Sequence, residues 1–177
     1  KQLSKFLALM LRHKADSFGV VLDAEGFADL DAVWAVVQAR FGQGYSRAHL
    51  DALLSDSMTA QRFEIRDGKI RARYGHSEDV RAVVYPAAEP PPLLYHGTYV
   101  DALKAILAEG IHAQSRQYVH LSTSIEHVLR VAERHGKPIV LQVSAAQMHA
   151  AGFVFYQPEP LVYLTKTVPP QYLTLLA

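Results

Sequence analysis

The chain contains no cysteine, which excludes disulfide bonds and zinc sites built on thiolates. It also lacks an apolar run of about eighteen residues, the length that a membrane-spanning helix needs. Its first residues, Lys1-Gln2-Leu3, lead directly into a helical pattern and lack the apolar core of a signal peptide. We therefore expect a cytoplasmic protein with no membrane segment.

Neither sign of charge is in excess, since 18 lysines and arginines accompany 17 aspartates and glutamates, for a net charge of +1. This balance argues against a generally basic nucleic-acid-binding surface. One segment is locally basic, with cations at Arg62, Arg66, Lys69, Arg71 and Arg73. Such a segment suits either a few phosphate contacts or a solvated, charged hairpin, and composition does not decide between them.

Several sequence motifs of enzymes are missing as well. No Gly-x-Gly-x-x-Gly follows a predicted strand, and neither a Walker loop nor a Gly-x-Ser-x-Gly elbow is present. No two histidines have the His-Glu-x-x-His arrangement of a zinc helix, so we predict no metal site. The residues on their own therefore indicate neither a nucleotide cofactor nor a reaction.

A proline-rich segment divides the chain into two lobes. Residues 86–92 read Pro-Ala-Ala-Glu-Pro-Pro-Pro, which cannot continue a helix and offers few donors to a sheet. We predict an extended linker there, between a first lobe over residues 1–85 and a second lobe over residues 93–177. No internal repeat is visible.

The first lobe has the pattern of three helices followed by a hairpin. Apolar residues recur at helical spacing from Leu3 to Leu11 and again around Trp34, and Ser46 is placed to cap a third helix. Alternating residues on both sides of Asp67-Gly68 predict a tight hairpin. This order of elements is typical of a winged helix, a fold that binds nucleic acids or proteins.

The second lobe mixes short strands with helices. We predict strands over residues 93–96, 119–122, 138–143, 153–156 and 161–164, and helices over residues 100–109 and 125–134. The expected fold class of the whole chain is therefore α+β.

Candidate functional residues of the first lobe lie where its elements end. Arg12 and His13 close the first helix, where a cation stabilises the helix dipole but can also bind a phosphate. Arg62 opens the hairpin. The run Gly75-His76-Ser77 offers backbone N–H groups, a hydroxyl and an imidazole, which together suit an anion.

The second lobe carries two histidines on predicted strands. One lies in Tyr95-His96-Gly97-Thr98 and the other in His120-Leu121-Ser122. Both could face one cleft, although each taken alone is more readily a buried core histidine. A basic turn, Arg134-His135-Gly136, follows the second predicted helix of this lobe.

Six segments occur in a fixed order along nearly the whole chain: Leu11-Arg12-His13, Gln61-Arg62-Phe63, Gly75-His76-Ser77, Tyr95-His96-Gly97-Thr98, Val119-His120-Leu121-Ser122 and Arg134-His135-Gly136-Lys137-Pro138. Together they resemble the tRNA 2′-phosphotransferase family, the KptA-type enzymes. The resemblance implies a winged-helix RNA-binding lobe followed by an ADP-ribosyltransferase-like lobe that binds NAD⁺.

The resemblance also implies a two-step reaction without a metal. An internal RNA 2′-phosphate attacks the anomeric carbon of the nicotinamide ribose and expels nicotinamide, which leaves 2′-phospho-ADP-ribosylated RNA. The ribose 2″-hydroxyl then attacks the phosphorus. The products are RNA with a free 2′-hydroxyl and ADP-ribose 1″,2″-cyclic phosphate, so NAD⁺ is consumed as a co-substrate and the partner is a tRNA-like RNA that carries a 2′-phosphate.

Site residues carry over from the family position by position. The implied catalytic tetrad is Arg12, His13, Arg62 and Arg134. The implied NAD⁺ contacts are Tyr95, His96, Gly97, Thr98, His120, Leu121 and Ser122. The implied RNA contacts are Arg71, Gly75, His76 and Ser77.

The chain departs from the family pattern at three places. Ala60 stands where the family often has lysine, Tyr74 stands where it usually has glutamine, and residues 159–164 replace a strand of the Asn-Gly-Val-Trp-Leu type. None of these changes removes a member of the tetrad. They concern substrate contacts and rate more than the type of reaction.

Two other functions fit parts of the sequence. A winged-helix regulator would read duplex DNA, but the presumed recognition helix over residues 46–56 carries Arg47 as its one cation against Asp51 and Asp56. An ADP-ribosyltransferase acting on RNA or protein would share the first step and leave ADP-ribose attached. We expect the protein to be a monomer.

Overall fold

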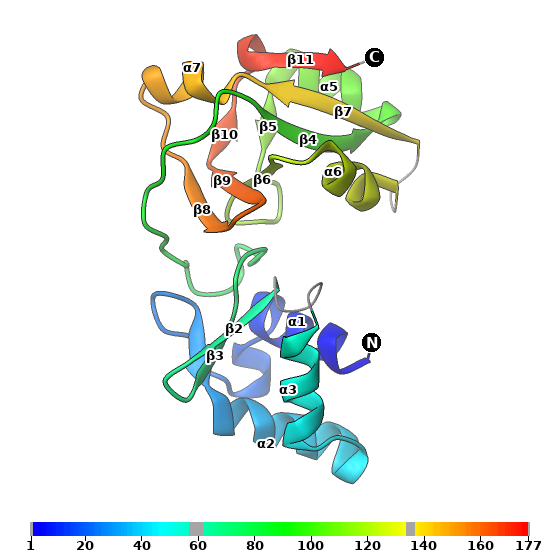
Figure 1. Cartoon of the computed structure of the whole chain (residues 1–177), viewed down its shortest axis with the longest axis vertical. Coiled ribbons are helices and arrows are strands. Elements are labelled where there is room, and N and C mark those ends of the chain that lie inside the picture. The colour runs from blue at the N-terminus through cyan, green and yellow to red at the C-terminus, as the bar shows by residue number, and fades with distance from the viewer. Residues whose placement is uncertain (1, 57–61, 134–136, 177) are drawn as a thin grey trace. The chain divides into compact units, whose positions relative to one another are not determined.

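The computed structural model describes residues 2–56, 62–133 and 137–176. The chain forms two compact units, Lys1–Val84 and Tyr85–Ala177 (Figure 1). The proline-rich segment 86–92 belongs to the second unit. There the backbone N–H of Ala88 donates to the carbonyl of Phe155 over 2.8 Å, so part of the predicted linker is anchored to this unit.

The first unit consists of helices and a small antiparallel sheet. Its elements are α1 (Gln2–His13), β1 (Phe27–Asp29), α2 (Leu30–Phe41), α3 (Arg47–Ser55), β2 (Phe63–Arg66) and β3 (Lys69–Ala72), with 3₁₀ turns at Asp16–Phe18 and Gly42–Gly44. The strands are ordered β1-β3-β2. Strand β1 was missed by the sequence interpretation, because three residues are too few to show an alternating pattern.

Local signals explain where the helices and the hairpin of this unit begin. The carboxylate of Asp29 accepts a hydrogen bond of 2.8 Å from the N–H of Ala32 and caps α2. Ser46 and His49 form a reciprocal capping box at the start of α3. Asp67 and Gly68 have φ angles of 51° and 72°, the left-handed pair that a tight hairpin turn requires.

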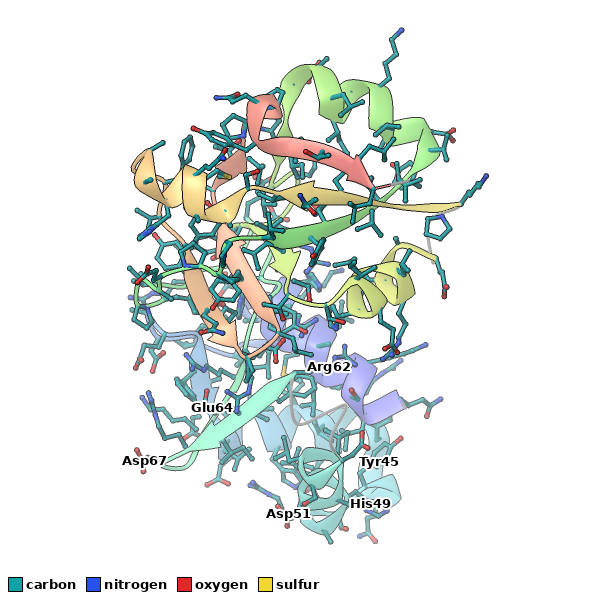
Figure 2. The ribbon with its side chains drawn as sticks, turned by 45° about the horizontal axis from the view of Figure 1, so that its top comes forward. Tyr45, His49, Asp51, Arg62, Glu64 and Asp67 are labelled. Carbon is teal, nitrogen blue, oxygen red and sulfur yellow. The ribbon has the colours of Figure 1, made fainter. Side chains whose placement is uncertain are left out.

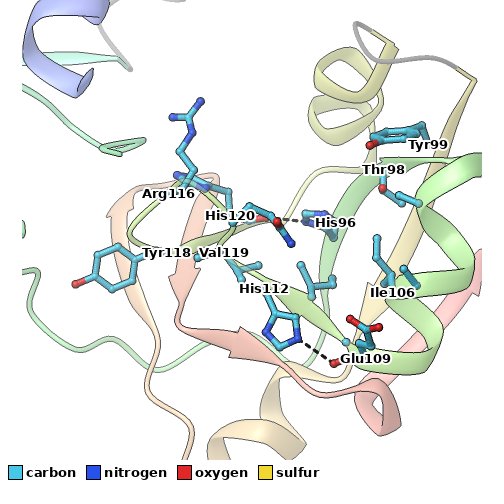
Figure 3. Close-up of a pocket in the computed structure, with 16 residues that line it drawn as sticks. His96, Thr98, Tyr99, Ile106, Glu109, His112, Arg116, Tyr118, Val119 and His120 are labelled. Carbon is cyan, nitrogen blue, oxygen red and sulfur yellow. Dashed lines mark hydrogen bonds between the residues drawn. The ribbon is translucent and has the colours of Figure 1, made fainter. Parts of the chain in front are cut away.

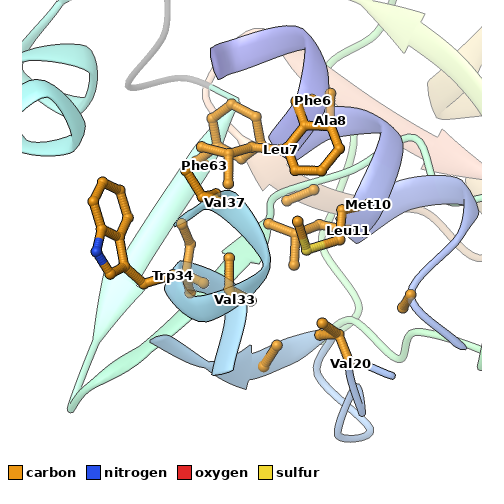
Figure 4. Packing of buried hydrophobic residues seen from close by; sticks show 14 of the residues in the cluster. Phe6, Leu7, Ala8, Met10, Leu11, Val20, Val33, Trp34, Val37 and Phe63 are labelled. Carbon is orange, nitrogen blue, oxygen red and sulfur yellow. The ribbon is translucent and has the colours of Figure 1, made fainter. Parts of the chain in front are cut away.

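The core of the first unit joins α1 to α2 and to the hairpin (Figure 4). Leu7 and Leu11 of α1 are almost completely buried, as are Val33 of α2 and Phe63 of β2. Burial of each such side chain contributes about 1.5–3 kcal/mol. The same packing fixes the end of α1 and the start of β2, where Arg12 and Arg62 lie.

The second unit is built on a sheet of six strands. Its elements are β4 (Leu94–Tyr99), α5 (Val100–Glu109), β5 (Ile111–His112), β6 (Val119–Ser122), α6 (Ile125–Ala132), β7 (Pro138–Val143), α7 (Ala145–Ala150), β8 (Tyr156–Glu159), β9 (Val162–Thr165), β10 (Thr167–Val168) and β11 (Leu173–Leu176), with a 3₁₀ turn at Pro170–Tyr172. The large sheet has the antiparallel order β11-β7-β4-β6-β9-β8, and β10 pairs with β5.

The mixture of helices and an antiparallel sheet confirms the α+β class, while several element bounds differ from the prediction. Strand β4 continues through Gly97 to Tyr99, where an end had been expected. The predicted strand over 153–156 is wrong except for Tyr156. Phe155 is buried, but its carbonyl accepts from Ala88 and does not extend the ladder of β8.

The remaining differences concern short elements. Strands β5, β10 and β11 and helix α7 were not predicted, and α6 ends at Ala132, before the expected end at residue 134. None of the helices in the described ranges is long and apolar enough to cross a membrane.

Candidate functional site

A pocket of about 480 Å³ opens between α5, β5 and β6 of the second unit (Figure 3). Three of the predicted cofactor-binding residues line it: His96 and Thr98 from β4, and His120 from β6. Apolar atoms of Ile106 and Val119 form other parts of its wall. Pockets of this size, mostly apolar with a few polar groups, are typical of small-molecule sites.

The two histidines meet where β4 and β6 separate. These strands are paired only at Tyr95 and Ser122, and beyond that pair the Nδ1 atom of His96 lies 3.0 Å from the carbonyl oxygen of His120. Because a carbonyl only accepts, Nδ1 carries the proton and the neutral ring presents Nε2 as an acceptor. Burial lowers the pKa of His96 below its ordinary value, although the hydrogen bond to His120 opposes this shift. His96 is therefore neutral around pH 7.

Arg116 also lines the pocket and was missed by the sequence interpretation. It lies in the loop that leads into β6, and it is the one lysine or arginine among the pocket residues in the described part of the chain. Removal from solvent lowers its pKa, yet a guanidinium stays charged at any physiological pH. A lone arginine in a loop gives no periodic signal in the sequence. The one indication of its place was that it lies three residues before Val119, where the predicted strand that carries His120 begins.

The other predicted cofactor-binding residues lie outside the pocket lining. Leu121 is buried in the core of the unit. Ser122 is buried too, and its hydroxyl donates to the carbonyl of Leu161 over 2.8 Å and accepts from the N–H of Ser124. A Cβ atom on Gly97 would lie 2.3 Å from the carbonyl oxygen of Val128, so glycine allows α6 to pack closely on β4. These residues, with Tyr95, build the frame that holds the two histidines.

In the first unit, the end of α1 is tied to the segment after the hairpin. The carbonyl of Arg12 accepts hydrogen bonds from the N–H and the hydroxyl of Ser77, over 2.9 and 3.2 Å. The guanidinium of Arg12 lies 5.2 Å from the ring centre of Tyr74. His76 and Ser77 are buried, whereas His13 is half-buried. The structure thus brings Arg12 and the predicted RNA-contacting run 75–77 together.

Arg62 is held against α1 from the other side of the hairpin. Its Nη1 atom donates to the hydroxyl of Ser4 over 3.1 Å, and its carbonyl accepts from the N–H of Arg73 over 3.0 Å. Figure 2 shows Arg62 at the start of β2 and Asp67 at the far turn. The guanidinium of Arg62 also lies over the ring of Phe63, 5.7 Å from its centre, and neither of these two contacts is with a carboxylate.

The other cations of the basic segment are paired with carboxylates. Arg71 lies 2.6 Å and Arg73 3.6 Å from Glu64, and the guanidinium of Arg71 also stacks on Phe27. Two further pairs, each 3.0–3.1 Å long, join Arg66 to Glu25 and Lys69 to Asp23. These pairs favour the charged-hairpin interpretation for most of the segment, and a role of Arg71 in RNA binding stays a prediction.

The carboxylate of Asp23 anchors one of those pairs. Burial raises its pKa, but hydrogen bonds from the N–H groups of Phe27 and Glu25 and the contact with Lys69 outweigh that effect, so the pKa is lowered. Asp23 therefore stays ionised, and its negative charge offsets the positive charge of Lys69 in their ion pair.

Arg134 of the predicted tetrad lies outside the described residues, with its neighbours 135 and 136. Ala60, one of the departures from the family pattern, lies outside them as well. Tyr74, a departure from the family pattern, provides the ring beneath Arg12. Across residues 2–56, 62–133 and 137–176, no cluster of three or more histidine, aspartate or glutamate residues is arranged to hold a metal ion.

Residues 1–167 match the family described as RNA 2′-phosphotransferase, Tpt1 / KptA family. A protein of Agrobacterium fabrum named probable RNA 2′-phosphotransferase is 45% identical over 98% of this chain and 93% of its own length. Proteins of the same name from Pseudomonas aeruginosa and Burkholderia lata are 42% and 41% identical, over 96% and 97% of this chain and 93% and 89% of their own lengths. The chain therefore belongs to the Tpt1/KptA family of RNA 2′-phosphotransferases.

Proposed function

We propose that this RNA 2′-phosphotransferase consumes NAD⁺ and passes an internal RNA 2′-phosphate to its ADP-ribose moiety. The observation that carries the proposal is the pocket of the second unit, in which two histidines and a partly buried arginine converge. In this proposal the second unit is an ADP-ribosyltransferase-like lobe, and the first unit is a winged-helix lobe that binds the RNA.

The pocket suits a dinucleotide in size and chemistry. Its volume of about 480 Å³ accommodates a large part of such a ligand. Arg116 offers its guanidinium to the diphosphate, and bidentate, charge-assisted contacts of this kind are strong when water is excluded. Ile106 and Val119 offer apolar contact to a base or ribose.

His96 is proposed to orient the sugar of the co-substrate. Its Nδ1–H group is engaged by the carbonyl of His120, which fixes the tautomer and the ring. The Nε2 atom of the neutral ring can accept a hydrogen bond from a ribose hydroxyl. Bound NAD⁺ supplies an activated anomeric carbon with nicotinamide as the leaving group. Thr98, on the same wall, offers a second polar contact.

Arg12, His13 and Arg62 are proposed to bind the RNA 2′-phosphate. A phosphate dianion must approach another anionic molecule, and guanidinium groups offset that repulsion through paired N–H donors. Arg62 supports this role because its described side-chain contacts are with a neutral hydroxyl and an aromatic ring. Arg134 remains a proposed fourth member, and Arg116, which lines the pocket of the second unit, is a further arginine available to an anionic ligand.

The run 75–77 is proposed to contact the RNA backbone, together with Arg71. Gly75 has a φ of 88°, which favours glycine at this position. The hydrogen bonds between Ser77 and Arg12 couple this turn to the end of α1. RNA bound at the turn would therefore lie close to the proposed phosphate-binding residues of this unit.

A turnover assay tests the proposal. A short RNA with one internal 2′-phosphate is incubated with the protein, with and without NAD⁺, in the presence of a chelator. We expect loss of the phosphate only with NAD⁺, and release of nicotinamide and an ADP-ribose cyclic phosphate. Retention of ADP-ribose on the RNA would instead indicate a simple ADP-ribosyltransferase. An RNA and an NAD⁺ pool that both stay unchanged would contradict the proposal.

A further inference from the structure

Ser4 is a polar residue on the buried face of helix α1. Its exposed fraction is 7%, and its neighbours Leu3, Leu7 and Ala8 are buried as well. Leu7 and Ala8 follow at spacings of three and four residues, so they share the helix face of Ser4. Alanine would suit this face, because it has a higher helix propensity and no hydroxyl to remove from water. The packing of α1 alone therefore does not explain a serine at this position.

The hydroxyl of Ser4 is hydrogen-bonded to the guanidinium of Arg62. Its oxygen accepts from Nη1 of Arg62 over 3.1 Å, and this contact joins the first turn of α1 to the residue before β2, 58 positions later in the chain. The same guanidinium lies 5.7 Å from the ring centre of Phe63, which is buried in the core of the first unit. Two neutral groups on different elements thus restrain the orientation of the Arg62 side chain.

A neutral acceptor has a particular consequence for an arginine. On the neighbouring strands, Arg71 lies 2.6 Å from the carboxylate of Glu64, which offsets its charge and would compete with a phosphate for it. A hydroxyl orients a guanidinium without adding a negative charge. Arginine also loses much rotamer freedom when it binds a ligand, and a side chain that is restrained beforehand loses less. The contact with Ser4 therefore suits an arginine that binds an anion.

We infer that Ser4 is a positioning residue for the phosphotransfer reaction, because it holds the guanidinium of Arg62 in the orientation that binds the RNA 2′-phosphate. This inference rests on the proposed role of Arg62 in binding that phosphate. Ser4 acts through Arg62 and needs no contact of its own with the RNA. Its loss should weaken recognition of the 2′-phosphate and leave the other contacts with the RNA unchanged.

Equilibrium binding of two RNAs without NAD⁺ tests the inference. The RNAs have one sequence, and one of them carries an internal 2′-phosphate. Fluorescence anisotropy with the whole chain gives their dissociation constants, whose ratio measures recognition of the phosphate. We expect Ser4→Ala to reduce this ratio about three- to tenfold, through weaker binding of the phosphorylated RNA. A partly unfolded variant would bind both RNAs more weakly and keep the ratio, so the ratio distinguishes positioning from a folding defect.

Ser55→Ala is the matched control. It also removes a hydroxyl from a helix, but this hydroxyl is exposed and donates to the backbone carbonyl of Asp51. The control should keep the ratio of the unmodified chain. Steady-state kinetics on Ser4→Ala should show kcat/KM for the phosphorylated RNA lowered by about the same three- to tenfold, with an unchanged KM for NAD⁺.

A double-mutant cycle shows whether Ser4 acts through Arg62. When Arg62 is already replaced by alanine, the further change Ser4→Ala should alter the ratio less than about twofold. An equal effect of Ser4→Ala with and without Arg62 would overturn the inference, because Ser4 would then act on another group.

The outcomes separate this inference from the proposed function. If Arg62→Ala lowers the ratio and Ser4→Ala does not, the inference is overturned and the role of Arg62 stands. If Arg62→Ala also keeps the ratio, the proposed role of Arg62 fails and the inference fails with it. Equal binding of both RNAs to the unmodified chain would likewise contradict recognition of the 2′-phosphate by Arg62.

Discussion

The hairpin of the first unit and the pocket of the second both contain arginine, but the two regions use its charge differently. On the hairpin, Arg66, Arg71 and Arg73 each lie within 3.6 Å of a carboxylate. In the pocket, Arg116 is placed on a wall that also carries two histidines, and removal from solvent lowers its pKa. A cluster of cations in a sequence therefore does not by itself locate the anion-binding site, because the fold can neutralise it.

The largest effect should come from Arg62, at the start of the hairpin, whose described contacts are with the hydroxyl of Ser4 and the ring of Phe63. We expect Arg62→Ala to lower kcat/KM for 2′-phosphorylated RNA on the order of 10²–10³-fold, the cost of removing a positioned charge. Arg66→Ala, which breaks an exposed ion pair with Glu25, should change it less than about threefold. Steady-state kinetics on the two variants measures the difference. An equal loss of kcat/KM in the two variants would show that cations held in ion pairs also bind the RNA substrate.

The pocket predicts a second contrast within one unit. Arg116→Ala should weaken ADP-ribose binding by at least about tenfold, because a charge-assisted contact to the diphosphate is lost. Arg130→Ala removes an exposed arginine paired with Glu126 on α6 and should leave binding unchanged. Calorimetry with ADP-ribose distinguishes them. If Arg134→Ala weakened ADP-ribose binding strongly and Arg116→Ala did not, the result would favour Arg134, the arginine that the family resemblance implies, over Arg116.

Close packing between α6 and β4 predicts a loss of stability that is independent of ligands. Gly97→Ala places a Cβ atom 2.3 Å from a backbone carbonyl of Val128. Relief of that overlap must shift the backbone and should lower the free energy of unfolding by about 1–3 kcal/mol. Gly44→Ala is the control, since a Cβ there meets no atom within 4 Å. Denaturant unfolding of both variants measures the difference, and equal stability would contradict this packing role.

The smallest predicted effect concerns the pH dependence of stability. The pKa of His96 is lowered in the folded chain, so below its ordinary value of 6.5 the unfolded chain takes up a proton that the folded chain resists. The free energy of unfolding should therefore decrease as the pH is lowered below 6.5, and this residue contributes at most about 1.4 kcal/mol per pH unit to the decrease. His96→Asn should show a shallower slope in urea unfolding at several pH values. Identical slopes would show that His96 is protonated alike in both states.

The sequence predicted the parts of the molecule that local signals specify. Helix α5 has the predicted bounds, Val100–Glu109, and the turn of the hairpin falls at Asp67-Gly68 as expected. Both rest on capping, periodicity or the left-handed turn. Strands of two or three residues, such as β1 and β5, have no such signal, and their pairing depends on distant partners.

The site was predictable to a similar degree. The sequence placed His96 and His120 on strands, and the structure brings them to one pocket. It did not indicate Arg116, which is isolated in a loop, or the ion pairs that join the hairpin to residues 23–25 across more than forty positions. Those contacts depend on tertiary packing. Family resemblance, and not local pattern, supplied the proposed catalytic roles of Arg12 and Arg62, although the place of Arg12 at a helix end also suited a phosphate.

Following the phosphorus atom would test the proposed reaction most directly. The substrate is an RNA whose internal 2′-phosphate carries a radioactive label, incubated with the unmodified chain and NAD⁺. We expect the label to leave the RNA only when NAD⁺ is present and to appear in a cyclic phosphate of ADP-ribose. Label released as inorganic phosphate, or released equally without NAD⁺, would contradict transfer to ADP-ribose and with it the proposed role of the pocket.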